Sequence, residues 1–266
     1  MKGVIMDIKP YKKDFDYSYT LGAFPTFELV KYKPEKVIEV FVHSSFTDME
    51  KLTLLCEEKH VKLTCNDKII NKLSDKGNVY VVGVFNKFED ELEKKSPHVV
   101  LVNPSDMGNV GNIIRSAAAF NIRDVAIIEP AADIFNPKTV RASMGSVFRI
   151  RHKRYGSFEE YRNTLIKERE LFTFMLNGEN QLTVANCPKP KIYSLIFGNE
   201  ATGLDDSFLK VGTSIIIPQS ELVDSLNLTI AAGVGMFMFQ NEKYRCQRYI
   251  GDCACANERI HILILV

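Results

Sequence analysis

The stretch 194–206, "SLIFGNEATGLDD", begins as a continuous apolar run and then opens into a short loop. The run ends at Phe197, and Gly198 follows it at once, with Gly203 closing the loop. A short apolar run bounded by glycine is typical of a buried strand. Because a glycine has no Cβ, a ligand can approach the backbone directly after the strand. The stretch predicts a core strand. Taken alone, its loop favours an ordinary turn with a solvated glutamate over a loop that presents Glu200 to a ligand or a cation.

Strands and helices alternate on both sides of this stretch. The apolar patterns predict strands at 98–103, 124–129, 171–176, 191–197 and 213–218, and helices at 109–120, 138–148, 157–170 and 225–246. Such alternation with continuous apolar strands predicts an α/β fold, a mostly parallel sheet covered by helices on both faces. Ligands of such sheets bind beyond the carboxyl ends of the strands, so we expect the chemistry in the loops there.

The first part of the chain predicts a separate small α/β unit. Its patterns predict helices at 24–32, 48–60 and 68–75 and strands at 37–43, 61–65 and 78–86. The charged stretch 87–97 has no apolar periodicity and is interpreted as a linker, with a domain boundary near residue 95. We therefore expect a small domain over 1–95, a larger one over 96–249, and an unassigned extension over 250–266.

Composition excludes some classes of protein. The chain has 266 residues, is 45% hydrophobic and carries a formal net charge of +1, so a nucleic-acid partner would need a local basic patch. Two clusters are candidates: Lys9, Lys12 and Lys13, and Arg149, Arg151, Lys153 and Arg154. A solvated face is the equally weighted alternative.

Neither a signal peptide nor a membrane span is predicted, which favours a soluble, cytoplasmic protein.

The six cysteines do not form a disulfide framework. Cys246, Cys253 and Cys255 lie close together near the end of the chain, with His261 beyond them. Their spacing differs from the paired C-x2-C pattern of zinc sites. We expect reduced thiols and no metal.

A second loop follows "IIIP" at 215–218, where Pro218 ends the strand. Ser225 or Asp224 is a candidate N-cap of the last helix. Asn227, placed just inside that helix, is unfavourable there unless its side chain has a partner.

A third loop, "NPSDMGNVGNIIRS" at 103–116, joins a strand to a helix, with Asn109 suited to the N-cap. The loop lacks both the G-x-x-x-x-G-K-[ST] and the G-x-G-x-x-G fingerprints, which disfavours a nucleoside triphosphate or NAD site. Arg115 lies in the second turn among apolar and small residues; a lone arginine there is more often exposed than functional.

"NVGNIIRSAAAF" (109–120), "IFGNEATGL" (196–204) and "IIIPQSELVDSLNLTIAAG" (215–233) together resemble the three successive motifs of the SpoU-type (TrmH-like) RNA ribose 2′-O-methyltransferases of the SPOUT superfamily. "VRASMGSVF" (140–148) is similar to a segment that these enzymes carry between the first two motifs. The resemblance covers about residues 98–246.

The resemblance implies a deep trefoil knot, a homodimer formed through the catalytic domain, and S-adenosylmethionine as cofactor. Matched motif to motif, the residues implied at the cofactor are Gly198, Ile217 and Leu226. Those implied around the target ribose are Asn109, Arg115, Glu200, Ser225 and Asn227, with Arg115 gripping a phosphate and stabilising the developing alkoxide. The first unit resembles, more loosely, a small RNA-binding domain. The implied substrate is RNA, ribosomal RNA more than transfer RNA.

Two rival hypotheses remain open from the sequence. One keeps the fold without the chemistry, as a non-catalytic RNA-binding module. The other is an ordinary nucleotide-binding α/β enzyme such as a dehydrogenase or kinase, against which the missing glycine-rich fingerprints count.

Overall fold

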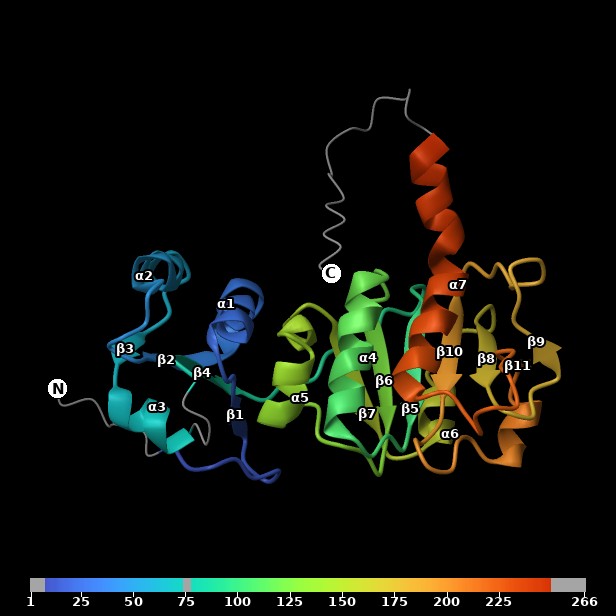
Figure 1. Ribbon diagram of the computed structural model, residues 1–266, viewed down its shortest axis with the longest axis horizontal. Helices are drawn as coiled ribbons and strands as arrows, with labels where there is room; N and C mark the ends of the chain where they lie inside the picture. Colours follow the sequence, from blue (N-terminus) through green and yellow to red (C-terminus); the bar gives the residue numbers. More distant parts are fainter. Residues whose placement is uncertain (1–7, 74–77, 250–266) are drawn as a thin grey trace.

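The structure, a computed structural model, describes residues 8–73 and 78–249. The expected extension 250–266, with Cys253, Cys255 and His261, lies outside these ranges. Two sheets stand side by side, one built by residues up to 86 and one by residues from 98 onward (Figure 1). No helix in the described ranges is both long and apolar enough to cross a membrane.

The larger sheet has seven strands in the order β7-β6-β5-β10-β8-β11-β9, and every neighbouring pair is parallel. The strands are β5 (His98–Val102), β6 (Asp124–Ile128), β7 (Arg151–Tyr155), β8 (Glu170–Phe174), β9 (Asn180–Gln181), β10 (Tyr193–Phe197) and β11 (Thr213–Ile216). All residues of β5, β6 and β10 are buried, as expected for strands covered on both faces. The predicted α/β class with a parallel sheet is confirmed.

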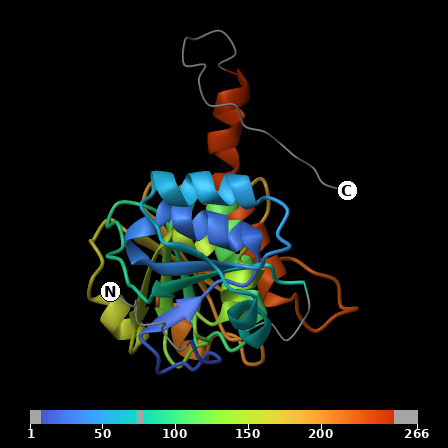
Figure 2. The ribbon, with the colours of Figure 1, turned by 90° about the vertical axis from the view of Figure 1, so that its left-hand side faces the viewer.

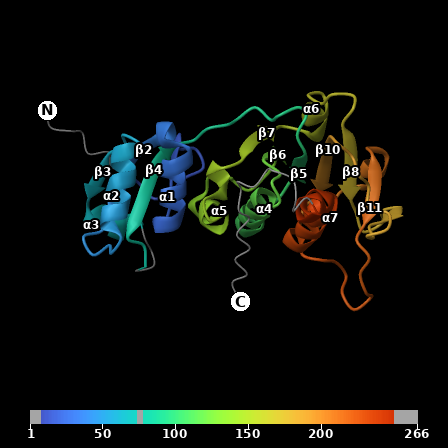
Figure 3. The same cartoon turned by 90° about the horizontal axis from the view of Figure 1, so that it is seen from above.

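Helices cover both faces of this sheet (Figure 3). On one face lie α4 (Met107–Ala119), α5 (Pro137–Ala142) and α7 (Leu228–Tyr249), packed through Ile113, Val140 and Met236. On the other lie α6 (Phe158–Arg162) and the 3-10 helix η3 (Asp206–Lys210), where Phe158 and Phe208 have ring centroids 4.8 Å apart.

The smaller sheet has four strands in the order β1-β4-β2-β3: β1 (Tyr17–Tyr19), β2 (Val37–Val42), β3 (Leu63–Cys65) and β4 (Val81–Asn86). Helices α1 (Ala23–Tyr32) and α2 (Met49–Glu58) cover one face (Figure 2), and α3 (Asp67–Leu73) covers the other; η1 (Pro34–Lys36) is one short turn. The predicted helices and strands of this part are present. β1 was not predicted, because three residues carry too little pattern.

The helix predicted over 138–148 is wrong after Ala142. Gly145 adopts a left-handed conformation (φ 74°), and a short 3-10 turn, η2 (Ser146–Phe148), follows it. A Cβ on Gly145 would lie 2.7 Å from the Cβ of Glu28 in α1. The break in the helix therefore lets α1 of the smaller sheet pack closely against the larger unit.

The helix predicted over 157–170 is wrong after Arg162. The chain turns there and buries Arg169, whose guanidinium donates to the carbonyl oxygens of Lys94, Ser96 and Tyr193 at 2.6 to 2.8 Å. A continuing helix would carry Arg169 away from these acceptors, so tertiary hydrogen bonds override the helical pattern.

The charged segment 87–97 is packed rather than extended into solvent. Phe88 is buried against Phe135, with ring centroids 4.9 Å apart, and Lys33 pairs with Asp90 at 3.0 Å. The backbone N–H of Glu93 donates to Asp124 at the start of β6. Contacts of this kind hold the two sheets together.

Candidate active site

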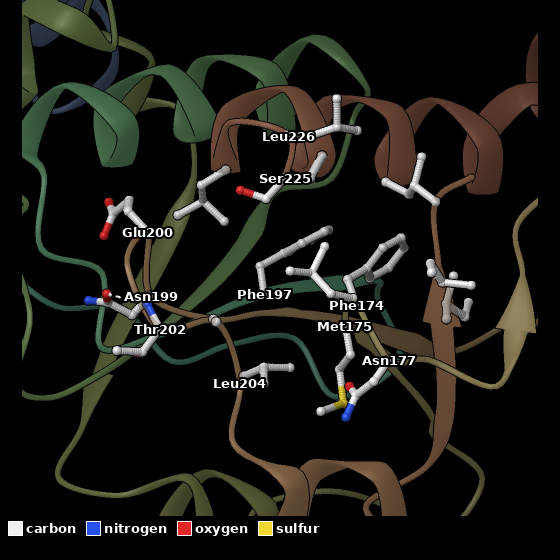
Figure 4. A pocket seen from close by; sticks show the side chains of 18 of the residues that line it. Phe174, Met175, Asn177, Phe197, Asn199, Glu200, Thr202, Leu204, Ser225 and Leu226 are labelled. Atoms are coloured by element: carbon white, nitrogen blue, oxygen red, sulfur yellow. Dashed lines mark hydrogen bonds between the residues drawn. The ribbon is translucent and has the colours of Figure 1, made fainter. Parts of the chain in front are cut away.

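A pocket of about 480 Å³ lies beyond the carboxyl ends of β10, β8 and β11 (Figure 4). Its walls are formed by residues 174–177, 197–204, 206, 215–217, 219, 225, 226, 228 and 231. These segments include the loops after two of the predicted strands and the start of the last helix. Gly198, Glu200, Ile217, Ser225 and Leu226 all line this one cavity.

Glu200 is anchored to the N-terminus of α4. Its carboxylate accepts hydrogen bonds from the N–H and the hydroxyl of Ser105 (2.9 and 2.8 Å), the N–H of Asp106 (3.1 Å) and the side-chain amide of Asn109 (3.2 Å). Burial favours the neutral carboxyl, but the donors of Ser105 and Asn109 outweigh it and hold the pKa of Glu200 below its usual value. The carboxylate is thus ionised, and a helix N-terminus is a favourable place for it.

The prediction that Asn109 is the N-cap of α4 is wrong, because Asp106 takes that position. The carboxylate of Asp106 accepts the backbone N–H of Asn109 at 2.7 Å. The side chain of Asn109 is thereby left to donate to Glu200. Asn109 and Glu200 are therefore in direct contact, although Asn109 itself does not line the pocket.

Gly198 sits where a side chain does not fit. A Cβ on it would lie 2.2 Å from the carbonyl carbon of Gly203, because the backbones of Asn199 and Gly203 pair across the loop. The side chain of Asn199 accepts the N–H of Ala201 at 2.8 Å and donates to the carbonyl oxygen of Asn103 at 2.7 Å. Asn199 is not among the residues predicted from the sequence, although its place directly after a strand-ending glycine is a usable signal.

Asn227 is the residue that caps α7, and the prediction of a helix beginning at 225 is wrong. Its side-chain oxygen accepts the N–H of Thr229 at 2.8 Å and the hydroxyl of Thr229 at 2.5 Å. Asparagine is among the best N-cap residues, which explains its position. Asn227 does not line the pocket, but its neighbours Ser225 and Leu226 do.

The deeper wall of the pocket is apolar. Phe174 and Phe197 stack with centroids 4.5 Å apart, and Ile215, Ile217 and Leu228 continue this wall. Polar groups at the cavity include Asn177 and Gln219, which the sequence analysis missed because neither stands in a distinctive pattern.

Arg115 lies apart from the pocket lining. It occupies an exposed position on α4, and its side chain makes no hydrogen bond or ion pair with any residue that the structure describes. The guanidinium is therefore available for an external partner.

The basic cluster 149–154 does not form a free cationic patch. Each cation has a carboxylate partner: Arg149 with Glu28, Arg151 with Asp124, Lys153 with Glu91 and Arg154 with Glu89. All but Arg149 belong to β7, an edge strand that the sequence analysis missed because its side chains are nearly all polar. Within 8–73 and 78–249, no group of three or more metal-ligand side chains is close enough to hold a metal ion.

The SpoU rRNA Methylase family matches residues 96–237, more than half of the chain. The chain belongs to the SpoU rRNA Methylase family. This match spans the pocket, the α4 N-terminus and the start of α7.

Curated relatives of the chain are named RNA methyltransferases. The chain is 29% identical over 147 residues to 23S rRNA (guanosine(2553)-2′-O)-methyltransferase RlmP of Bacillus subtilis, covering 55% of this chain and 58% of RlmP. It is 24% identical over 209 residues to 23S rRNA (adenosine(1067)-2′-O)-methyltransferase of Streptomyces azureus, covering 75% and 77%. The matched part spans about half the length of RlmP and of an uncharacterised tRNA/rRNA methyltransferase from Synechocystis.

Solved structures share the fold. An AdoMet-bound rRNA methyltransferase from Sinorhizobium meliloti aligns with a TM-score of 0.72 at 25% identity, covering 85% of this chain and 88% of that one. The SpoU methyltransferase AviRb from Streptomyces viridochromogenes aligns with a TM-score of 0.74 at 21% identity, covering 87% and 91%.

Proposed function

We propose that this SpoU family chain transfers a methyl group from S-adenosylmethionine to a ribose 2′-hydroxyl of RNA. The observation that carries the proposal is the single pocket shared by Gly198, Ile217, Ser225 and Leu226, with Glu200 fixed beside it. The names of the relatives and the AdoMet-bound Sinorhizobium structure support the same reaction.

The residues present fit the cofactor. The pocket volume of about 480 Å³ lies within the range of about 300–1,000 Å³ typical of ligand sites. An apolar wall at Phe197 and Ile217 suits a purine, and the lack of a Cβ at Gly198 lets the backbone of Gly203 pack against it and close the loop that lines the pocket. Gly198, Ile217 and Leu226 would hold the cofactor. When bound, S-adenosylmethionine supplies the methyl group that is transferred.

Glu200 acts in this proposal as a positioning residue. Its carboxylate is ionised, and its oxygens are already engaged by Ser105, Asp106 and Asn109, so it is a poor candidate for a general base. Asn109 shares the positioning role. Ser225 orients the ribose or the cofactor at the pocket rim, and Asn227 fixes the start of the helix that follows.

Arg115 is the residue that contacts the substrate. A guanidinium stays charged and grips a phosphate through paired donors, which fits an exposed side chain without a protein partner. It stabilises the alkoxide as the hydroxyl loses its proton to the neighbouring phosphate or to water. Holding the ribose oxygen in line with the methyl donor supplies much of the acceleration.

The knot belongs to the proposal as well. α7 follows β11 in the chain, yet it crosses back past β8 to reach β10 and α4. The ring centroid of Phe239 lies 4.8 Å from that of Phe172 and 5.3 Å from that of Tyr193. The ring centroids of Phe237 and Phe120 are 6.1 Å apart. A chain that returns across its own sheet in this way suits the trefoil knot expected of SPOUT proteins.

A homodimer through the catalytic domain is proposed from an exposed apolar stripe on α7. Ile230 and Phe237, two turns apart, are 54% and 47% exposed. Arg115 is exposed on α4, the helix that α7 packs against. Burial of apolar surface between two copies is a common use of such a stripe.

The division into a domain over 1–95 that binds RNA and a catalytic domain over 96–249 is proposed on the two separate sheets. Ribosomal RNA is the favoured substrate, because the relatives from Bacillus and Streptomyces azureus are named for 23S rRNA. A transfer RNA is the alternative, since the relative from Synechocystis is named an uncharacterised tRNA/rRNA methyltransferase. A cytoplasmic location fits either substrate.

Calorimetric titration with S-adenosylmethionine, NAD and ATP separates this proposal from its rivals. We expect binding of S-adenosylmethionine alone. Binding of NAD or ATP in its place would support the nucleotide-binding enzyme, and cofactor binding without transfer to any RNA would support the non-catalytic module.

A further inference from the structure

A second cavity, of about 270 Å³, lies where the two sheets meet. We call it the seam pocket; it is lined by Lys13, by residues 87–89 and 133–135, and by His152 and Arg154. These residues come from the N-terminal arm, the segment between the sheets, the loop after β6, and β7. β7 is the outer strand of the larger sheet and is separated from β10 by β6 and β5. The seam pocket is therefore distinct from the cofactor pocket.

His152 is the unusual member of this lining. Its side chain is fully buried, and neither ring nitrogen has a hydrogen-bond partner among the described residues. The ring lies between Phe88 and Phe135, with centroids 5.1 and 5.0 Å away. Burial lowers the pKa of His152 to about 4, so the imidazole is neutral. A buried polar group without a partner is costly, which points to a partner that enters from outside.

The mouth of the seam pocket carries cations. The side chains of Lys13 and Arg154 are 59% and 46% exposed. Lys13 pairs with Glu129 at 4.0 Å, and Arg154 pairs with Glu89 at 2.8 Å and with Glu129 at 3.7 Å. Ion pairs between solvated groups of this kind contribute little. Deeper in the pocket, Asp133 is engaged by the hydroxyl of Tyr11 and by Lys87. An incoming anionic group can therefore take Lys13 and Arg154 from their present partners at small cost.

We propose that the seam pocket binds a single nucleotide, with the base against His152 and Phe135 and the phosphate at Lys13 and Arg154. A neutral imidazole offers one donor and one acceptor, which is the complement that the polar edge of a base requires. Aromatic walls and cations at the rim are the combination that binds unpaired nucleotides. The source of the nucleotide is the RNA strand, and that part of the inference rests on the proposed function.

Nuclear magnetic resonance of the full chain with ¹³C-labelled histidine tests the inference. The His152 signal is assigned by its loss in His152→Phe, a variant that fills the site without leaving unpaired nitrogens. The probes are the four nucleoside monophosphates, inorganic phosphate and short single-stranded RNAs. We expect at least one monophosphate and the RNA to shift the His152 signal, with the RNA binding more tightly, and phosphate alone to leave it unchanged.

The double variant Lys13→Ala/Arg154→Ala should weaken RNA binding by about tenfold or more. The matched control is Lys12→Ala/Lys153→Ala, which removes the same charge from the same two segments but outside the lining. No shift with any probe would mean that only water fills the pocket. The full shift with phosphate alone, or equal weakening in the control, would overturn the nucleotide site. Tighter binding of free nucleotide than of RNA would overturn the RNA source.

Methyl transfer is measured in the same preparations, so that the two proposals fail separately. Nucleotide binding at His152 without methyl transfer to RNA would contradict the proposed function alone. Methyl transfer by a protein whose His152 signal never moves would contradict the seam pocket alone.

Discussion

The side-chain amide of Asn109 donates to Glu200 at 3.2 Å, although 91 residues separate the two in the chain. Glu200 belongs to the loop after β10, and Asn109 to the first turn of α4. With the two bonds from Ser105, the contact fixes one wall of the cofactor pocket to the N-terminus of a helix packed on the same sheet. The geometry of the pocket therefore depends on an ionised carboxylate held by these donors.

Replacement of this carboxylate by an amide tests its structural role. Glu200→Gln places an NH₂ group among donors, so we expect a loss of about 1–3 kcal/mol in the free energy of unfolding and weaker cofactor binding. Urea unfolding and calorimetry measure the two effects. Glu168→Gln, at an exposed carboxylate, is the control. Equal stability of both variants would show that the bonds to Glu200 do not hold the loop.

The close contact at Gly198 predicts a strong steric effect. In Gly198→Ala the new methyl group would overlap the backbone of Gly203, so the loop must move. We expect S-adenosylmethionine affinity to fall by at least about tenfold, equivalent to about 1.4 kcal/mol. The control Gly156→Ala meets only the far end of the Glu160 side chain, at 3.2 Å. Unchanged affinity in Gly198→Ala would remove this glycine from the cofactor site.

A substitution at Arg115 should reduce methyl transfer without changing cofactor binding. Arg115→Ala removes an exposed side chain without a described partner, so stability and cofactor affinity should stay at wild-type values while methyl transfer falls by about a hundredfold or more. Transfer assays and calorimetry on the same preparation measure both. Arg162→Ala, on α6 across the sheet, should retain full activity. Turnover at the wild-type rate by Arg115→Ala would exclude the arginine from the mechanism.

Two buried histidines predict acid sensitivity. Burial, aided by Arg169 beside His98, lowers the pKa values of His98 and His152 to about 4, from an ordinary value of 6.5. The unfolded chain binds these protons first as the pH falls, so the free energy of unfolding should decrease between pH 6.5 and about 4, by up to about 1.4 kcal/mol per pH unit for each histidine. Urea titrations of wild type and His152→Phe measure the slope, which should be smaller in the variant. Identical slopes would contradict a neutral His152.

The proposed dimer predicts a change of mass in solution. Phe237→Asp places a charge in the exposed stripe of α7, and we expect it to convert a dimer into a folded monomer. Light scattering measures the mass, and circular dichroism checks the fold. Leu54→Asp, at a 60% exposed position on α2, is the control and should remain dimeric. A monomeric wild type would contradict the homodimer.

The apolar patterns sufficed for the parallel sheet and for most helices, because buried strands and amphipathic helices carry their periodicity locally. The patterns failed where contacts with residues distant in the sequence determine the secondary structure. β7 is a strand although its side chains are polar, since Glu89, Glu91 and Asp124 neutralise its cations. The helix expected to reach residue 170 ends early because Arg169 finds acceptors in other segments.

The site residues divide in the same way, into those that a local motif indicates and those that depend on the path of the chain. Gly198, Ser225 and Leu226, which the motifs selected, line one pocket. The motifs did not locate the caps: Asp106 and Asn227 begin their helices, where Asn109 and Ser225 or Asp224 were expected. Several polar residues compete for each cap, and only the path of the chain decides among them.

The most direct test of the central claim is the fate of a deuterated methyl group. Purified protein, S-adenosylmethionine with a CD₃ group, and unmodified ribosomal or transfer RNA are incubated, and the digested nucleosides are analysed by mass spectrometry. We expect CD₃ on the ribose of one nucleotide position, and none with Arg115→Ala. Label on a base, or no label in either RNA from a protein that binds the cofactor, would contradict it.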